Sequence, residues 1–147
     1  MARMKPYLFD TSVLIPALVA SHPHHARAHP WLARALNEQL KLFLSAHSLA
    51  ETFAVLTRLP LKPMVPPGVA YHLLDENLGC AEIVELSTAQ YWRVLDRMRC
   101  LMLSGGMVYD ALTVEVARHL GVAQILTFNV RDFKRLWPEG EQRIIAP

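Results

Sequence analysis

The sequence predicts a single α/β domain in which a parallel sheet carries helices on both faces. Short apolar runs alternate along the chain with longer segments whose apolar residues recur at helical spacing. Strands that alternate with helices form parallel sheets, because each helix returns the chain to the end of the sheet where the next strand begins. The length of 147 residues suits one compact domain, and 52% hydrophobic residues with a net charge of +2 exclude a disordered chain.

Short apolar segments are the expected strands. Tyr7-Leu8-Phe9 and Leu42-Phe43-Leu44 are continuous apolar runs, a pattern typical of strands that are buried on both faces. The segment nearest the C-terminus is expected at an edge of the sheet. The expected strands are residues 7–9, 42–44, 81–86, 124–127 and 142–145.

The expected helices are bounded by capping residues and glycines. Thr11 or Ser12 can cap the first helix, and Gly79 and Gly121 end two later ones. Residues 59–68 contain four prolines, which break any regular element, so this segment is expected to be a loop within the domain. The expected helices are residues 13–17, 23–40, 45 or 48 to 59, 69–78, 88–103, 109–120 and 131–136.

The apolar content does not indicate a membrane or secreted protein. Stretches such as Val13 to Ala20 are shorter than the ~20 residues that a bilayer needs, and Asp10 interrupts the N-terminal run, so no signal peptide is expected. We expect a cytoplasmic protein. Cys80 and Cys100 lie in apolar contexts and are expected to be reduced, small core residues. A pI of 8.7 permits a nucleic-acid partner without requiring one.

Four carboxylates lie among apolar residues. A buried charge is costly there unless it is paired with an opposite charge or bound to a metal. Asp10 ends the first expected strand, Asp132 follows the fourth, Asp110 lies in the first turn of a helix, and Glu51 lies about one turn into another. Ligands of open α/β sheets bind at the carboxyl ends of the strands, so these acids can converge there. Mg²⁺ or Mn²⁺ is the counter-charge that oxygen donors prefer, and it supports phosphodiester hydrolysis.

Each acid also has an ordinary structural interpretation when it is taken alone. Asp10 could cap the first helix, and Asp110 could interact with a helix dipole. Glu51 could complete a capping box with Ser48, three residues earlier. Asp132 could pair with Arg135 or cap its helix. Only the joint spacing of the four acids predicts a site.

The order and context of these acids resemble the PIN-domain ribonucleases of the VapC toxin family. The resemblance extends from Tyr7 to Phe133. It implies a single PIN domain over residues 1–147, with three α/β/α layers and a central, mostly parallel sheet of four or five strands. The segments that carry it are Asp10-Thr-Ser, Ala50-Glu51-Thr, Gly105-Gly106-x-x-Tyr-Asp110-Ala-Leu and Thr127-Phe-Asn129-x-x-Asp132-Phe.

By this resemblance the chain is an endoribonuclease that depends on Mg²⁺, with Mn²⁺ as a substitute. Asp10 and Asp110 would be the principal metal ligands, and Glu51 would complete the acidic site directly or through water. Asp132 is the fourth expected catalytic acid, although Asn129 could take that position instead. The same analogy makes Ser12 and Thr127, with Asn129, residues that support the acids or contact the substrate.

The resemblance also implies partners. The protein would be the toxin of a toxin–antitoxin pair, silenced by a VapB-type antitoxin, with RNA as its substrate and a homodimer as its assembly. The apolar excess then predicts contact surfaces, for which we expect the stripes of the first helix and of the helix that carries Glu51, with residues 60–67.

Two other enzyme classes require acids that this sequence lacks. A haloacid-dehalogenase-type phosphatase would need an acid where Ser12 stands, and a receiver domain would need adjacent acids before its first helix. A PIN-like module that binds nucleic acid without strong nuclease activity is the alternative from another functional class. The histidines of residues 22–29 are expected at a solvated helix start.

Overall fold

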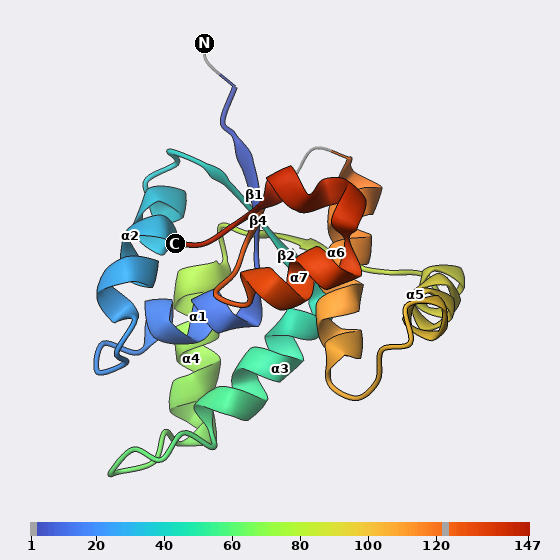
Figure 1. The fold of residues 1–147 in the computed structure, drawn as a ribbon. Coiled ribbons are helices and arrows are strands. Elements are labelled where there is room, and N and C mark those ends of the chain that lie inside the picture. The colour runs from blue at the N-terminus through green and yellow to red at the C-terminus, as the bar shows by residue number, and fades with distance from the viewer. Residues whose placement is uncertain (1–2, 122–123) are drawn as a thin grey trace.

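A computed structural model describes residues 3–121 and 124–147 and contains a five-stranded, parallel sheet with the strand order β3-β2-β1-β4-β5 (Figure 1). The predicted α/β fold with a parallel sheet is therefore confirmed. The strands are β1 (Pro6–Phe9), β2 (Lys41–Ser45), β3 (Glu82–Val84), β4 (Gln124–Leu126) and β5 (Ile144–Ile145).

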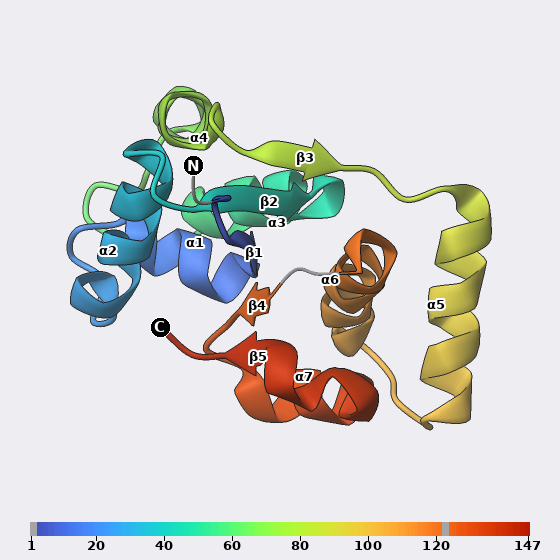
Figure 2. The same cartoon turned by 90° about the horizontal axis from the view of Figure 1, so that it is seen from above.

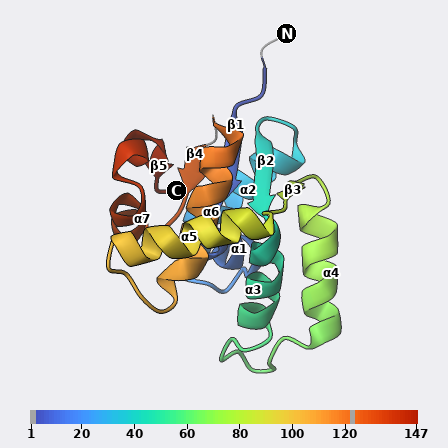
Figure 3. The ribbon, with the colours of Figure 1, turned by 90° about the vertical axis from the view of Figure 1, so that its right-hand side faces the viewer.

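Helices cover both faces of this sheet. The first four helices pack around one face, and the last three lie on the other (Figure 2). Figures 2 and 3 show α6 between the sheet and α5, so α5 is the outermost element on its side. The helices are α1 (Thr11–Leu18), α2 (His25–Leu36), α3 (Ala46–Leu56), α4 (Pro67–Leu78), α5 (Thr88–Cys100), α6 (Met107–Leu120) and α7 (Val130–Leu136), and a 3₁₀ segment (Pro138–Arg143) precedes β5.

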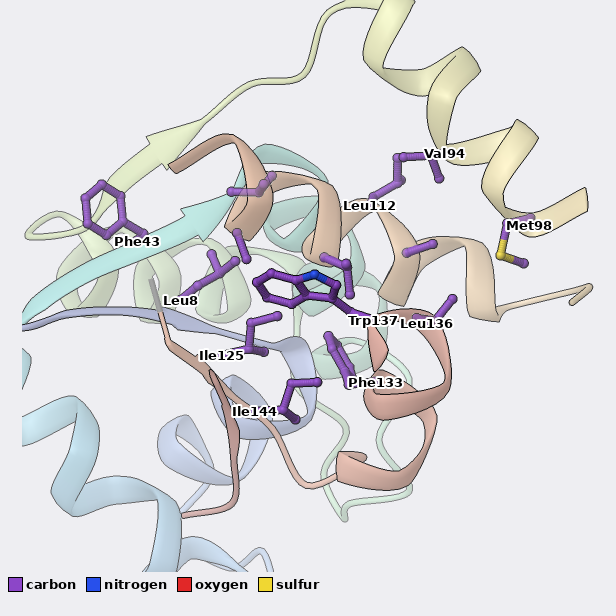
Figure 4. Close-up of a cluster of buried hydrophobic side chains, with 14 residues drawn as sticks. Leu8, Phe43, Val94, Met98, Leu112, Ile125, Phe133, Leu136, Trp137 and Ile144 are labelled. Atoms are coloured by element: carbon purple, nitrogen blue, oxygen red, sulfur yellow. The ribbon is translucent and has the colours of Figure 1, made fainter. Parts of the chain in front are cut away.

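The alternation of side chains along the central strands divides the core in two. Tyr7 and Phe9 pack toward α1 and α2, whereas Leu8 between them packs toward α6 and α7. Figure 4 shows the second cluster, in which the Trp137 indole lies near Leu8 and Phe133. Both faces of β1 are therefore buried, which explains its continuous apolar run.

Several element boundaries differ from the sequence prediction. The predicted cap at Thr11 or Ser12 is wrong, because Asp10 is the extended N-cap residue and its carboxylate accepts a hydrogen bond from the Ser12 amide. Helix α2 ends at Leu36 rather than Leu40, because Glu38 adopts a left-handed φ of 55°.

The cysteines are reduced as predicted, but their predicted place in the core is wrong. Cys80 and Cys100 are free thiols, and both are exposed. Val94 and Met98 are the buried apolar residues of α5, four positions apart, and Cys100 does not share their face. A local apolar context therefore did not indicate which side of the helix would be covered.

Helix α1 does not offer the predicted contact surface. Val13, Leu14 and Ala17 are all buried in the core, so its apolar stripe is used within the domain. On α3, by contrast, Phe53 and Val55 are exposed.

No helix in residues 3–121 and 124–147 is long and apolar enough to cross a bilayer.

The close fit of the 3₁₀ segment against Trp137 predicts a strong effect of one small substitution. A Cβ atom at the buried Gly140 would overlap the indole of Trp137, which is packed in the core. We expect Gly140→Ala to lower the free energy of unfolding by about 1–3 kcal/mol, the usual cost of overpacking.

Urea unfolding of both proteins measures this difference. Gly68→Ala is the matched control, because a Cβ atom at Gly68 meets nothing within 4 Å. Equal stability of Gly140→Ala and the parent chain would contradict the packing described for Trp137.

Candidate active site

A pocket of about 580 Å³ lies where the predicted acids were expected to converge, at the carboxyl ends of the central strands. Figure 1 shows α1 and α3 leaving this end of the sheet, with the first turns of α6 beside them. Three carboxylates from distant segments line the pocket. They are Asp10 after β1, Glu51 within α3 and Asp110 in the first turn of α6.

Asp10 is held in place by hydrogen bonds to a single carboxylate oxygen. Its Oδ2 accepts from the Ser12 hydroxyl at 2.7 Å, from the Thr127 hydroxyl at 2.9 Å and from the Ser12 amide at 3.4 Å. Only 4% of the residue is exposed, and this burial raises the pKa of the Asp10 carboxyl although the hydrogen bonds act to lower it. Its orientation is thus fixed, while its charge is costly.

Thr127 and Ser12 join Asp10 to the turn that follows β4. The fully buried Thr127 hydroxyl accepts a hydrogen bond from the Asn129 amide at 2.9 Å, and the Ser12 hydroxyl accepts from the Phe128 amide at 3.0 Å. The predicted supporting residues Ser12 and Thr127 therefore both contact Asp10. They tie the start of α1 to the start of α7.

Glu51 reaches the pocket from the middle of α3. Burial raises the pKa of its carboxyl, and the negative charge of Asp10 raises it further. The capping box with Ser48 is not formed, because the buried Ser48 hydroxyl has no hydrogen-bond partner and Glu51 lines the pocket.

His47 lies beside Glu51, one helical turn earlier. Its Nε2 is 3.9 Å from Glu51 Oε2, and its Nδ1 contacts the Ser45 hydroxyl. Burial lowers the pKa of this imidazole, so His47 is neutral near pH 7 and leaves the charge of Glu51 unbalanced.

Asp110 experiences the combined negative charge of the site. Burial, followed by the charges of Asp10, Glu51 and Asp132, raises the pKa of its carboxyl to about 7. Without a cation, Asp110 therefore keeps its proton to a much higher pH than an ordinary aspartate does. A carboxyl with such a perturbed pKa in a pocket is typical of functional sites.

The structure separates the two candidates for the fourth position. Asn129 lines the pocket, and its side chain does not cap α7. Asp132 lies outside the pocket lining, with its carboxylate 3.9 Å from Arg135. Its charge nonetheless reaches Asp110, because it contributes to the raised pKa of that residue.

The donor set of the pocket suits a hard divalent cation. The lining described by the structure includes three carboxylates but no lysine or arginine to neutralise them. Oxygen donors of this kind are the ligands that Mg²⁺ and Mn²⁺ take. As they stand, no three His, Cys, Asp or Glu side chains in the described part of the chain form a metal-binding group, so Glu51 or Asp110 would have to move toward the fixed carboxylate of Asp10 to share one ion.

The sequence prediction missed three histidines at this site. His22 and His24 line the pocket, and His47 contacts Glu51. The spacing of four residues between His47 and Glu51 on one helix was a usable signal, since such residues share a face. Nothing in the sequence indicated that His22 and His24 would lie opposite the acids.

Comparison with known protein sequences finds one matching family and similar ribonucleases. Residues 7–136 match a family described as PIN domain. The chain is 40% identical over 116 residues to Ribonuclease VapC27 of Mycobacterium tuberculosis, covering 78% of this chain and 79% of that protein. It is 34% identical over 135 residues to Ribonuclease VapC40 of the same species, covering 90% and 95%.

Solved structures share the fold. VapC20 of Mycobacterium tuberculosis, described as a toxin that cleaves the sarcin-ricin loop, superposes with a TM-score of 0.66 at 17% identity, covering 86% of this chain and 92% of that one. A chain of VapBC2 from Rickettsia felis, crystallised with a DNA fragment from its promoter, gives a TM-score of 0.61 at 20% identity and covers 96% of each chain.

The raised pKa of Asp110 predicts a pH dependence of stability in metal-free buffer. The folded protein holds the Asp110 proton up to about pH 7, whereas the unfolded chain releases it near 3.8. The folded state therefore binds more protons in this window, and the Asp110 contribution to the free energy of unfolding falls as pH rises from about 4 to about 7.

Urea unfolding with EDTA at several pH values tests this prediction. We expect Asp110→Asn to gain stability relative to the parent chain across the window, since the variant has no carboxyl to ionise. A stability difference between the two proteins that does not change with pH would contradict the assignment.

Proposed function

This chain belongs to the VapC family of PIN-domain ribonucleases, and we propose that it is a metal-dependent endoribonuclease that acts as the toxin of a toxin–antitoxin pair. The observation that carries the proposal is the convergence of Asp10, Glu51 and Asp110 in one pocket, from segments far apart in the chain. The ribonuclease names of the relatives at 34% and 40% identity support it.

Asp10, Asp110 and Glu51 would hold Mg²⁺ or Mn²⁺, Glu51 directly or through water. Bound there, the ion would activate a water molecule and neutralise charge on an RNA phosphodiester. Neither Cys80 nor Cys100 lines the pocket, and the Ser12 hydroxyl that does is hydrogen-bonded to Asp10 and to the Phe128 amide. We therefore propose direct in-line hydrolysis without a covalent intermediate.

The chain's own residues orient the carboxylates. Ser12 and Thr127 fix Asp10 through Oδ2, and Oδ1 takes none of those three hydrogen bonds. Ion ligands held by such supporting groups bind more tightly, because less order has to be imposed on binding. We propose that Asn129 fills the fourth position in the pocket and that Asp132 contributes negative charge from outside it.

An antitoxin partner is part of this proposal. The VapBC2 name of a structural relative supports a partner of this kind. With α1 used in the core, the remaining candidate surface consists of the exposed Phe53 and Val55 of α3 with the neighbouring residues 60–67. A homodimer and a cytoplasmic location complete the proposal.

Removing the Asp10 charge should abolish activity. Asp10→Asn keeps the size of the side chain but weakens the cation site, so we expect RNA cleavage in Mg²⁺ to fall to the level measured in EDTA, and the toxicity of the expressed protein to disappear. Gel analysis of a panel of RNA substrates measures the cleavage.

Asp96→Asn is the matched control, because Asp96 pairs with Arg99 on α5 and does not line the pocket. Within the same panel, Asn129→Ala should lose more activity than Asp132→Asn. Full Mg²⁺-dependent activity of Asp10→Asn would overturn the proposal. A parent chain that binds RNA but cannot cut it would favour the non-catalytic binding module.

A further inference from the structure

The four histidines between residues 22 and 29 divide into two pairs with different surroundings. His25 and His29 serve the fold: their Nδ1 atoms lie 2.7 Å from the carbonyl of Pro16 and 3.3 Å from that of Ala17. A carbonyl only accepts, so each imidazole donates. These bonds satisfy carbonyls in the last turn of α1, which lack amide partners within the helix.

His22 and His24 face the acidic pocket instead. The His24 ring stacks on Phe128 with 4.8 Å between centroids and 20° between planes. The His24 amide donates to His22 Nδ1 at 3.1 Å, which fixes the two histidines relative to each other. His24 is exposed. Phe128 stacks on its ring, and the His22 ring lies 5.7 Å away with 40° between the planes, so the accessible part of the His24 ring is what a ligand could contact.

This pair of stacked rings is positioned relative to the catalytic acids. The Phe128 amide donates to the Ser12 hydroxyl at 3.0 Å, and that hydroxyl donates to Asp10 Oδ2 at 2.7 Å. The Arg27 guanidinium lies 4.9 Å from the centroid of the Phe128 ring. Two hydrogen bonds therefore connect the aromatic platform to the carboxylate that would hold the ion.

Single-stranded RNA is recognised largely through bases that stack on aromatic side chains. The pocket lining described by the structure contains no lysine or arginine, so within the pocket RNA would be bound through the ion and through contacts to the bases, with Arg27 outside the lining beside Phe128. A solvent-exposed aromatic ring at the edge of the same pocket offers such a contact.

We infer that the His24–Phe128 pair binds, by stacking, the unpaired base of a nucleotide next to the scissile phosphate. This inference rests on the proposed ribonuclease function, and it assigns base selection to a specific pair of side chains. The base would stack on His24, and Phe128 holds the His24 ring in place by stacking against it.

The test compares His24→Ala, His24→Phe and His29→Ala in an Asp110→Asn background, which prevents cleavage. The probe is a short fluorescein-labelled single-stranded RNA of randomised sequence, and anisotropy measures its Kd. We expect His24→Ala to bind about tenfold more weakly, the loss of one stacked base. His24→Phe should restore binding, because it keeps an aromatic ring at this position. His29→Ala, which lies outside the pocket lining, should be unchanged.

A second measurement uses the cleavage-competent proteins. Sequencing the ends of products from the randomised RNA should show a base preference beside the cut that His24→Ala loses and His24→Phe and His29→Ala keep. Unchanged binding by His24→Ala, or a His24→Phe variant as weak as His24→Ala, would overturn the stacking role while leaving the nuclease intact. A parent chain that neither binds nor cuts RNA would overturn the proposed function as well.

Discussion

The buried carboxylate of Asp10 is the interaction on which the rest of the site depends. It follows β1, caps α1 and accepts hydrogen bonds from Ser12 and from Thr127, which follows β4, so three elements meet at one side chain. Burying a carboxylate is costly, and hydrogen bonds offset this cost only in part, because the pKa of Asp10 remains raised. The remaining cost is what a bound cation would remove.

The same constraint explains why Glu51 and Asp110 carry raised pKa values. Three acids share one pocket, and the neutral His47 beside Glu51 provides no positive charge. Such an arrangement weakens the fold in the absence of metal, and functional sites commonly carry this kind of strain. Stability and activity are therefore coupled through the same carboxylates, and a divalent cation would stabilise the folded state by binding it selectively.

The sequence was sufficient to predict the features that depend on local pattern. Continuous apolar runs at β1 and β2 indicated buried parallel strands, and the positions of Asp10, Glu51 and Asp110 after strands or at helix starts predicted their convergence. Features set by tertiary packing were not predictable in this way. Cys100 falls outside the buried face of α5, and the apolar side chains of α1 are buried within the core. His24 contacts Phe128 only because the start of α2 lies beside the turn after β4.

We propose that Asp10, Asp110 and Glu51 together hold a divalent cation. Anomalous diffraction from crystals of the protein soaked in Mn²⁺ would locate such an ion. We expect a peak between Asp10 and Asp110, with Glu51 adjacent or linked through water, and no such peak in Asp10→Asn crystals treated in the same way. A parent crystal without a peak in this pocket, or an Asp10→Asn crystal with an unchanged one, would contradict it.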